Sequence, residues 1–123
     1  MKRFDAEEQK SFCTSEGVMT PLAMNEDFAV IKISMPKGLA VKRHSHHREG
    51  VILVTKGKIV FDDGERHSVG CNDVLEYGAA ENIGFTALED AEALFITRKP
   101  QWTSLNAIYD LFAEMGIKPN LKS

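Results

Sequence analysis

The feature that most limits the fold of this chain is a series of short apolar runs, separated by turn residues, over residues 28–98. Residues 28–35 alternate in part between apolar and polar side chains, which predicts a half-buried strand. Residues 51–55 form a continuous apolar and β-branched run, which suits a strand covered on both faces. The Asp-Gly pair at 63–64 is a strong hairpin signal. About eight such segments at close, even spacing predict an all-β sandwich or barrel.

The pattern changes after Pro100. Thr103 or Ser104 can cap a helix, apolar side chains follow at helical spacing, and Gly116 is a natural end. The apolar stripe of this helix needs cover, so we expect the helix to lie on the outside of the barrel or against a second subunit.

The length of 123 residues indicates a single domain. We expect a polar N-terminal leader at residues 1–21, the barrel at about 22–99 and the helix at about 103–116.

Composition excludes several function classes. The formal net charge of −3 provides no basic field, which argues against a nucleic-acid partner. No apolar run approaches the roughly 18–20 residues that span a bilayer, so we expect no membrane partner. The first ten residues are polar and of mixed charge, unlike a secretory signal. We therefore predict a cytoplasmic protein.

The residues that carry chemistry lie in a second predicted strand, residues 39–46. His44 and His46 are two positions apart, and side chains two apart in a strand point to the same face. Two imidazoles on a stiff strand suit Fe, Ni, Cu, Zn and, with carboxylates, Mn. The alternative is that the histidines, with His47 beside them, belong to a solvated polar turn.

In this segment the sequence resembles the cupin superfamily, in particular its small single-domain members. The first cupin motif reads Gly, five residues, His-x-His, three or four residues, Glu, six residues, Gly. Gly38, His44, His46 and Gly57 match it. The position of the Glu falls on Gly50, and Glu49 is one residue early. A shift of one residue sends a strand side chain to the opposite face, so Glu49 reaches a metal only where a bulge or loop re-aims it.

The second cupin motif reads Gly, five residues, Pro-x-Gly, two residues, His, three residues, Asn. Gly70 and Gly78 keep its spacing, Glu81 stands at the position of the His, and Phe85 replaces the Asn. The resemblance implies that Glu81 supplies a carboxylate in place of the imidazole. The alternative is an exposed Glu in a loop.

The resemblance implies an all-β, double-stranded β-helix (jelly-roll) barrel with a short C-terminal helix, and a site at the barrel mouth. It implies one divalent ion (Fe, Mn, Ni or Zn) held by His44, His46 and Glu81, with Glu49 as a base. We expect a metal-dependent enzyme of the dioxygenase, isomerase or lyase type acting on a small polar molecule. The alternative is a non-catalytic module that binds or senses a small ligand such as a sugar or effector.

A homodimer is also expected. The apolar run 51–54 needs cover on two faces, and one barrel interior covers only one of them. The alternative is that the helix and the leader cover the outer face within one monomer.

Overall fold

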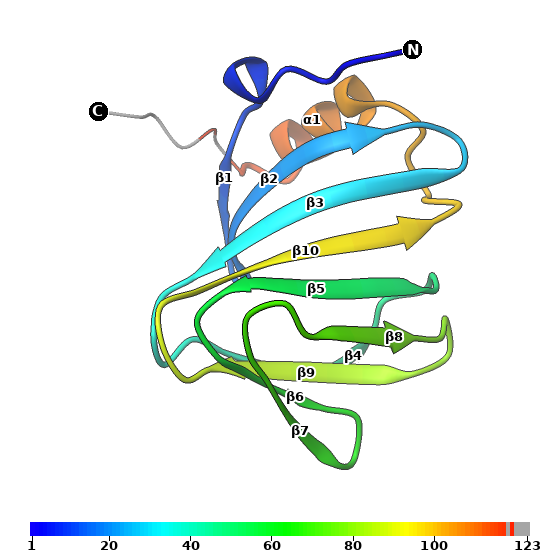
Figure 1. The fold of residues 1–123 in the computed structure, drawn as a ribbon. Coiled ribbons are helices and arrows are strands. Elements are labelled where there is room, and N and C mark those ends of the chain that lie inside the picture. Colours follow the sequence, from blue (N-terminus) through cyan, green and yellow to red (C-terminus); the bar gives the residue numbers. More distant parts are fainter. Residues whose placement is uncertain (118, 120–123) are drawn as a thin grey trace.

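The computed structural model describes residues 1–117 and residue 119. In it the chain forms two antiparallel sheets that enclose one core, with a short helix near the C-terminus (Figure 1). The predicted all-β, double-stranded β-helix barrel with a C-terminal helix is confirmed. In the described part of the chain, no helix is long and apolar enough to cross a lipid bilayer.

The larger sheet has six strands in the order β1-β2-β3-β10-β5-β8. Their bounds are β1 Phe12–Thr14, β2 Gly17–Met24, β3 Phe28–Met35, β5 Gly50–Lys56, β8 Val74–Tyr77 and β10 Ala91–Arg98. Two eight-residue strands that are far apart in the sequence, β3 and β10, lie side by side along their full length. This pairing closes the domain, because it brings distant parts of the sequence together.

The smaller sheet has four strands in the order β4-β9-β6-β7. Their bounds are β4 Ala40–Ser45, β6 Ile59–Asp62, β7 Arg66–Val69 and β9 Asn82–Ala87. The core lies between the two sheets and includes Ile52, Phe61, Phe85 and Phe95. These side chains point to the interior face of their strands.

The N-terminal segment is part of the sheet, which the sequence did not predict. Residues 1–21 were expected to lie before the barrel, but β1 and the start of β2 fall within them. Phe12 explains the difference, since its side chain is almost fully buried against the C-terminal helix. A short 3-10 helix, η1 (Ala6–Glu8), precedes these strands.

The helix α1 spans Leu105–Glu114, and the side chain of Ser104 caps its first turn by accepting a hydrogen bond from the Ala107 amide. Its apolar stripe packs with Phe12, Met24 and Ala29 in a second core. Ala29 lies on the same face of β3 as the interior residues Ile31 and Ile33, by strand alternation. The helix therefore covers one end of the concave face of the larger sheet and leaves the outer face of that sheet free.

Candidate metal centre

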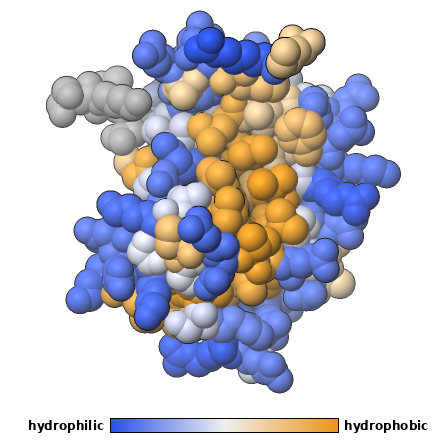
Figure 2. Space-filling model, viewed as in Figure 1, coloured by the Kyte–Doolittle hydropathy of each residue, from blue (hydrophilic) through white to orange (hydrophobic). Residues whose placement is uncertain are grey.

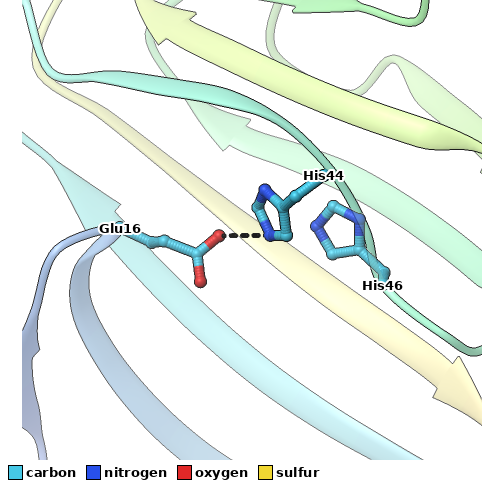
Figure 3. Close-up of side chains that lie close together, drawn as sticks. All are labelled: Glu16, His44 and His46. Carbon is cyan, nitrogen blue, oxygen red and sulfur yellow. Dashed lines mark ion pairs between the residues drawn. The ribbon is translucent and has the colours of Figure 1, made fainter.

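Three side chains from two distant parts of the chain meet at one end of the barrel. Glu16, His44 and His46 each offer a ligand atom, and these atoms all lie within 4.8 Å of one another. Figure 3 shows the carboxylate of Glu16 directed at the ring of His44, with the ring of His46 beside it. Two imidazoles and one carboxylate form a ligand set that divalent transition metals accept in proteins.

His44 lies near the end of β4, where it pairs with Ile83 of β9. The register of this pair of strands shifts between Val41 and His44, so the two residues between them form an irregular stretch. That stretch presses closely on Gly84, where a Cβ atom would lie 2.5 Å from the Val41 carbonyl oxygen. Gly84 thus allows β4 to approach β9 in the position that presents His44.

The hydrogen bonds of His44 orient its ring. Nδ1 lies 2.9 Å from the Lys42 carbonyl oxygen. Because a carbonyl oxygen only accepts, Nδ1 carries the hydrogen in this contact. Nε2 lies 3.2 Å from Oε1 of Glu16. In the neutral ring, Nε2 carries a lone pair that faces the Glu16 carboxylate. This arrangement needs a proton or a metal ion between the two atoms.

His46 provides the more buried imidazole. Its ring centroid lies 4.5 Å from that of His44, and the ring also packs beside Tyr77 and Phe95. Burial, and secondly the charges of His44 and His47, lower the pKa of His46 from 6.5 to about 4. The ring is therefore neutral at physiological pH, the state that binds metals. Its Nδ1 is buried and has no hydrogen-bond partner among the residues that the structure describes.

A tight turn after β4 holds His46 in place. The hydroxyl of Ser45 accepts a hydrogen bond from the His47 amide and donates one to the Ala79 carbonyl oxygen. His47 has a φ of 61°, in the left-handed region that suits a sharp change of direction. The turn thus fixes the backbone on the C-terminal side of His46 and leads the chain into β5.

Glu16 belongs to the two-residue turn between β1 and β2. The hydroxyl of Thr14 accepts a hydrogen bond from the Glu16 amide and donates one to the Gly17 carbonyl oxygen. Gly17 has a φ of 114°, and a Cβ atom there would lie 2.5 Å from the Ser34 carbonyl oxygen, so only glycine fits. The turn is tied by Thr14, which leaves the Glu16 carboxylate free to reach His44.

A cavity of about 200 Å³ adjoins the cluster, and both Glu16 and His46 line it. One wall is the concave face of β2, β3 and β10. The remaining lining comes from the turn after His46, from Tyr77 and from the segment that leads to α1, which contributes Trp102. Burial raises the pKa of Tyr77, so its phenol stays protonated. Its hydroxyl lies 3.2 Å from the Thr97 hydroxyl.

The structure brings together the two predicted histidines but not the two predicted carboxylates. Glu81 is exposed, and its Oε1 accepts a hydrogen bond from the Gly78 amide at 3.2 Å. Glu49 is also exposed, and its Oε1 lies 3.1 Å from Nη1 of Arg98. The carboxylate beside the histidine pair is that of Glu16, so the roles of Glu81 as a ligand and Glu49 as a base stay predictions.

The glycine at position 50 explains why the motif Glu is missing. A Cβ atom on Gly50 would lie 2.2 Å from the Ile96 carbonyl oxygen and 2.9 Å from the Tyr77 hydroxyl. The backbone of β10 and the Tyr77 side chain therefore occupy the space that a larger residue at position 50 needs.

Sequence reasoning missed Glu16 because nothing near it in the chain marks a site. Its only local signal is the turn sequence Thr-Ser-Glu-Gly at 14–17, which indicates a hairpin but no ligand. The approach of Glu16 to His44 depends on how the first hairpin packs across the barrel, which is a long-range contact.

Comparisons with known proteins agree with this architecture. No family model matches the chain, and no curated protein matches it. Among solved structures, an RmlC-like cupin from Shewanella frigidimarina matches with a TM-score of 0.75 and 16% identity, over 82% of this chain and 93% of that one. KdgF from Halomonas matches with a TM-score of 0.73 and 19% identity, over 81% and 96%.

A third similar structure is Pac13 of Streptomyces, a nucleoside dehydratase solved with uridine. It matches with a TM-score of 0.69 and 17% identity, over 80% of this chain and 82% of that one. At these identities the likeness is one of fold, which hosts many different activities. The two facing sheets, the histidine pair at one end of the barrel and these structural matches together show that the chain has the cupin fold.

Proposed function

We propose that this cupin binds one divalent ion through Glu16, His44 and His46 and acts as a metal-dependent enzyme on a small molecule. The observation that carries the proposal is the meeting of three donor side chains at the edge of a cavity. The ion is Fe, Mn, Ni or Zn, since all four accept imidazole with carboxylate.

The chemistry of the donor set fits a cation. The Nδ1 hydrogen of His44 points to a backbone carbonyl oxygen, the arrangement that typically orients metal-binding histidines. In the neutral ring the Nε2 lone pair then faces the Glu16 carboxylate, and a metal ion in place of a proton between them removes the repulsion. The neutral state of His46 leaves it able to donate a lone pair without first losing a proton.

A bound ion would supply polarisation of a carbonyl or enediolate oxygen, or activation of dioxygen. The protein's own groups would do the remaining work. The protonated hydroxyl of Tyr77 can donate a hydrogen bond to a ligand oxygen in the cavity. The apolar wall of the cavity limits the access of water to the bound ligand.

One observation favours the alternative of a binding module without turnover. Among the described residues that line the cavity, Glu16 is the only carboxylate. If Glu16 holds the ion, no second carboxylate remains to act as a base, because the carboxylate of Glu49 pairs with Arg98. Turnover would then depend on His47, on Tyr77 or on water.

Metal binding is tested by elemental analysis of the purified protein and by titration with Zn²⁺, Mn²⁺, Ni²⁺ and, without oxygen, Fe²⁺. We expect one ion per chain and little binding to Glu16→Gln. Little binding is also expected to His44→Ala and His46→Ala. Their matched control is His67→Ala, since His67 lies in β7 and pairs with Asp63. Equal metal affinity in the parent and in Glu16→Gln would remove Glu16 from the site.

The enzyme and the binding module are separated by a second measurement. The metal-loaded protein is incubated with a library of small carbonyl compounds and acids, and both ligand binding and product formation are followed. Product that disappears in His46→Ala supports the enzyme. A ligand that binds at the site but is recovered unchanged supports the module.

We also propose that the protein is a homodimer, and the outer face of the larger sheet is its candidate interface. Figure 2 shows a broad apolar patch on the face that Figure 1 presents, over β3, β10 and β5. By register, the outward and at least partly exposed apolar side chains here are Val30, Val51, Leu53, Val74, Leu94 and Ile96. The helix does not cover them, because it packs on the opposite face.

The dimer is tested by sedimentation equilibrium at micromolar concentration. We expect twice the mass of the chain for the parent and the mass of one chain for Leu94→Glu. Leu88→Glu serves as the control, since Leu88 is exposed in the turn after β9 and outside the patch. A parent that sediments as a single chain contradicts the dimer. A cytoplasmic location is likewise part of the proposal.

A further inference from the structure

The wall of the cavity is mainly apolar. Seven of its lining residues come from three neighbouring strands, and the strand register places them on one face: Met19, Met24, Ala29, Ile31, Ile33, Phe95 and Thr97. In that register Met19 pairs with Ile33, and Phe95 pairs with Ile31. Trp102 and Pro100 add further apolar surface from the segment before α1.

Most polar side chains of the lining come from two turns, and Gln101 adds one more from the segment before α1. Glu16, His46, His47 and Arg48 come from the first hairpin and from the turn after β4. The hydroxyls of Tyr77 and Thr97 bond to each other, which leaves one hydroxyl hydrogen of the pair for a ligand. The cavity therefore offers hydrogen bonds at one end and mainly apolar contact along its wall.

From this division we infer that the ligand is amphipathic. It has an apolar hydrocarbon body, which lies against β2, β3 and β10, and one oxygen-bearing head group, a carboxylate or a ketone, which reaches the Glu16 and His46 end. The sequence alone indicated a small polar molecule, and the lining argues for a different substrate class. The inference deepens the proposed function and rests on it only for the head group.

The cost of desolvation favours an amphipathic ligand over a sugar. Hydroxyl groups placed along the apolar wall would lose their bonds to water without gaining partners, which is costly. A hydrocarbon body in the same place gains from the burial of its own surface. The volume of about 200 Å³ is below the roughly 300–1,000 Å³ of typical drug-sized pockets, so the ligand is small.

The test uses straight-chain alkanoates from butanoate to octanoate as probes. Trp102 is the only tryptophan of the chain and lines the cavity, so its fluorescence reports binding. We expect the dissociation constant to fall about fourfold for each CH₂ group added until the cavity is filled. Gluconate is the matched polar probe for hexanoate, because both are six-carbon carboxylates. It should bind at least about 100-fold more weakly, since its hydroxyls find few partners on the wall.

Paired variants show whether the cavity is the binding place. Ile31→Gln puts an amide into the apolar wall and should weaken hexanoate binding at least about tenfold, because the buried amide lacks partners. Met19→Gln provides the same test at a partly buried position if Ile31→Gln fails to fold. Val74→Gln is the control, since Val74 is 58% exposed on the outer face and should leave binding unchanged.

The series is measured both with Zn²⁺ and without metal, which separates this inference from the proposed function. Chain-length dependence in both states supports the apolar site, even if no metal binds to the cluster. Gluconate binding as tightly as hexanoate, or no binding by any alkanoate, overturns the inference while the metal titration still stands. Loss of binding in Val74→Gln but not in Ile31→Gln would also overturn it, because the alkanoates would then lie on the outer face.

Discussion

Two carboxylates, Glu16 and Glu81, occupy similar places in the chain but have different surroundings. Each is the last residue of a tight turn and directly precedes a strand, β2 or β9. In the Glu16 turn the Thr14 hydroxyl binds the backbone amide, so the carboxylate extends to His44. In the Glu81 turn the carboxylate itself binds the Gly78 amide. A turn carboxylate is free to act as a ligand when another side chain stabilises the turn.

The largest effect on metal affinity is expected from loss of an imidazole. His44→Ala and His46→Ala should each lower the affinity by more than the roughly 10–100-fold that removal of an outer-shell partner costs. The far-UV circular dichroism should stay nearly unchanged, because both side chains are only partly buried. Calorimetric titration measures the affinity, with His67→Ala as the control. Parent-like affinity in both variants would place the metal elsewhere.

The difference between the two turn carboxylates in metal binding is tested by Glu16→Gln and Glu81→Gln. Each change keeps the size of the side chain and removes its charge, so any difference between them reports position. We expect Glu16→Gln to lower metal affinity at least about tenfold and Glu81→Gln to change it less than about twofold, since an amide is a weak ligand for these ions. If Glu81→Gln lowers metal affinity more than Glu16→Gln does, Glu81 is the ligand, as the cupin motif implied. Its side chain would then have to move to the histidines when metal binds.

A smaller effect is expected from Thr14→Val, which removes the hydroxyl that ties the Glu16 turn but keeps the shape of the side chain. The Glu16 carboxylate should then be less well positioned, and metal affinity should fall by about threefold to tenfold, at or below the lower end of outer-shell effects. Thr86→Val is a matched control on β9. Thr14→Val with parent affinity would show that the turn holds Glu16 without the hydroxyl.

The smallest expected effect is on the pH dependence of the free energy of unfolding in the metal-free protein. The pKa of His46 is about 4 in the folded chain and close to 6.5 when unfolded. Between these values the unfolded state binds more protons, so the free energy of unfolding rises with pH through this window and is level above about 6.5. Urea unfolding at several pH values, with a chelator present, measures this slope.

His46→Gln should reduce the slope. A parent and a His46→Gln variant with the same pH dependence would show that His46 is not the group that titrates.

The parts of the fold that the sequence predicted depend on local patterns. Strand alternation, the Asp-Gly turn and the spacing of the terminal helix are each contained in a short window, so an all-β sandwich or barrel and a terminal helix followed from them. The jelly-roll barrel was implied by the resemblance to the cupin motifs. The spacing of His44 and His46 is also local, and the structure brings their rings together.

The parts that the sequence did not predict depend on distant contacts. Phe12 becomes a core residue only because α1 packs on it, so β1 could not be distinguished from a polar leader. Glu16 reaches the histidines only through the pairing of β2 with β3. The space that a side chain at position 50 would need is filled by Tyr77 and by the β10 backbone, neither of which is near it in sequence.

The position of Glu16 on the first hairpin has a consequence for chain connectivity. An ion shared by Glu16 and His44 would cross-link the N-terminal hairpin to the opposite sheet and close a loop that contains β2 and β3. Because such a cross-link forms only in the folded chain, it stabilises the hairpin in proportion to metal occupancy. Amide hydrogen exchange in β1 would then report the metal supply, while the strands of the central core exchange at a rate set by global unfolding.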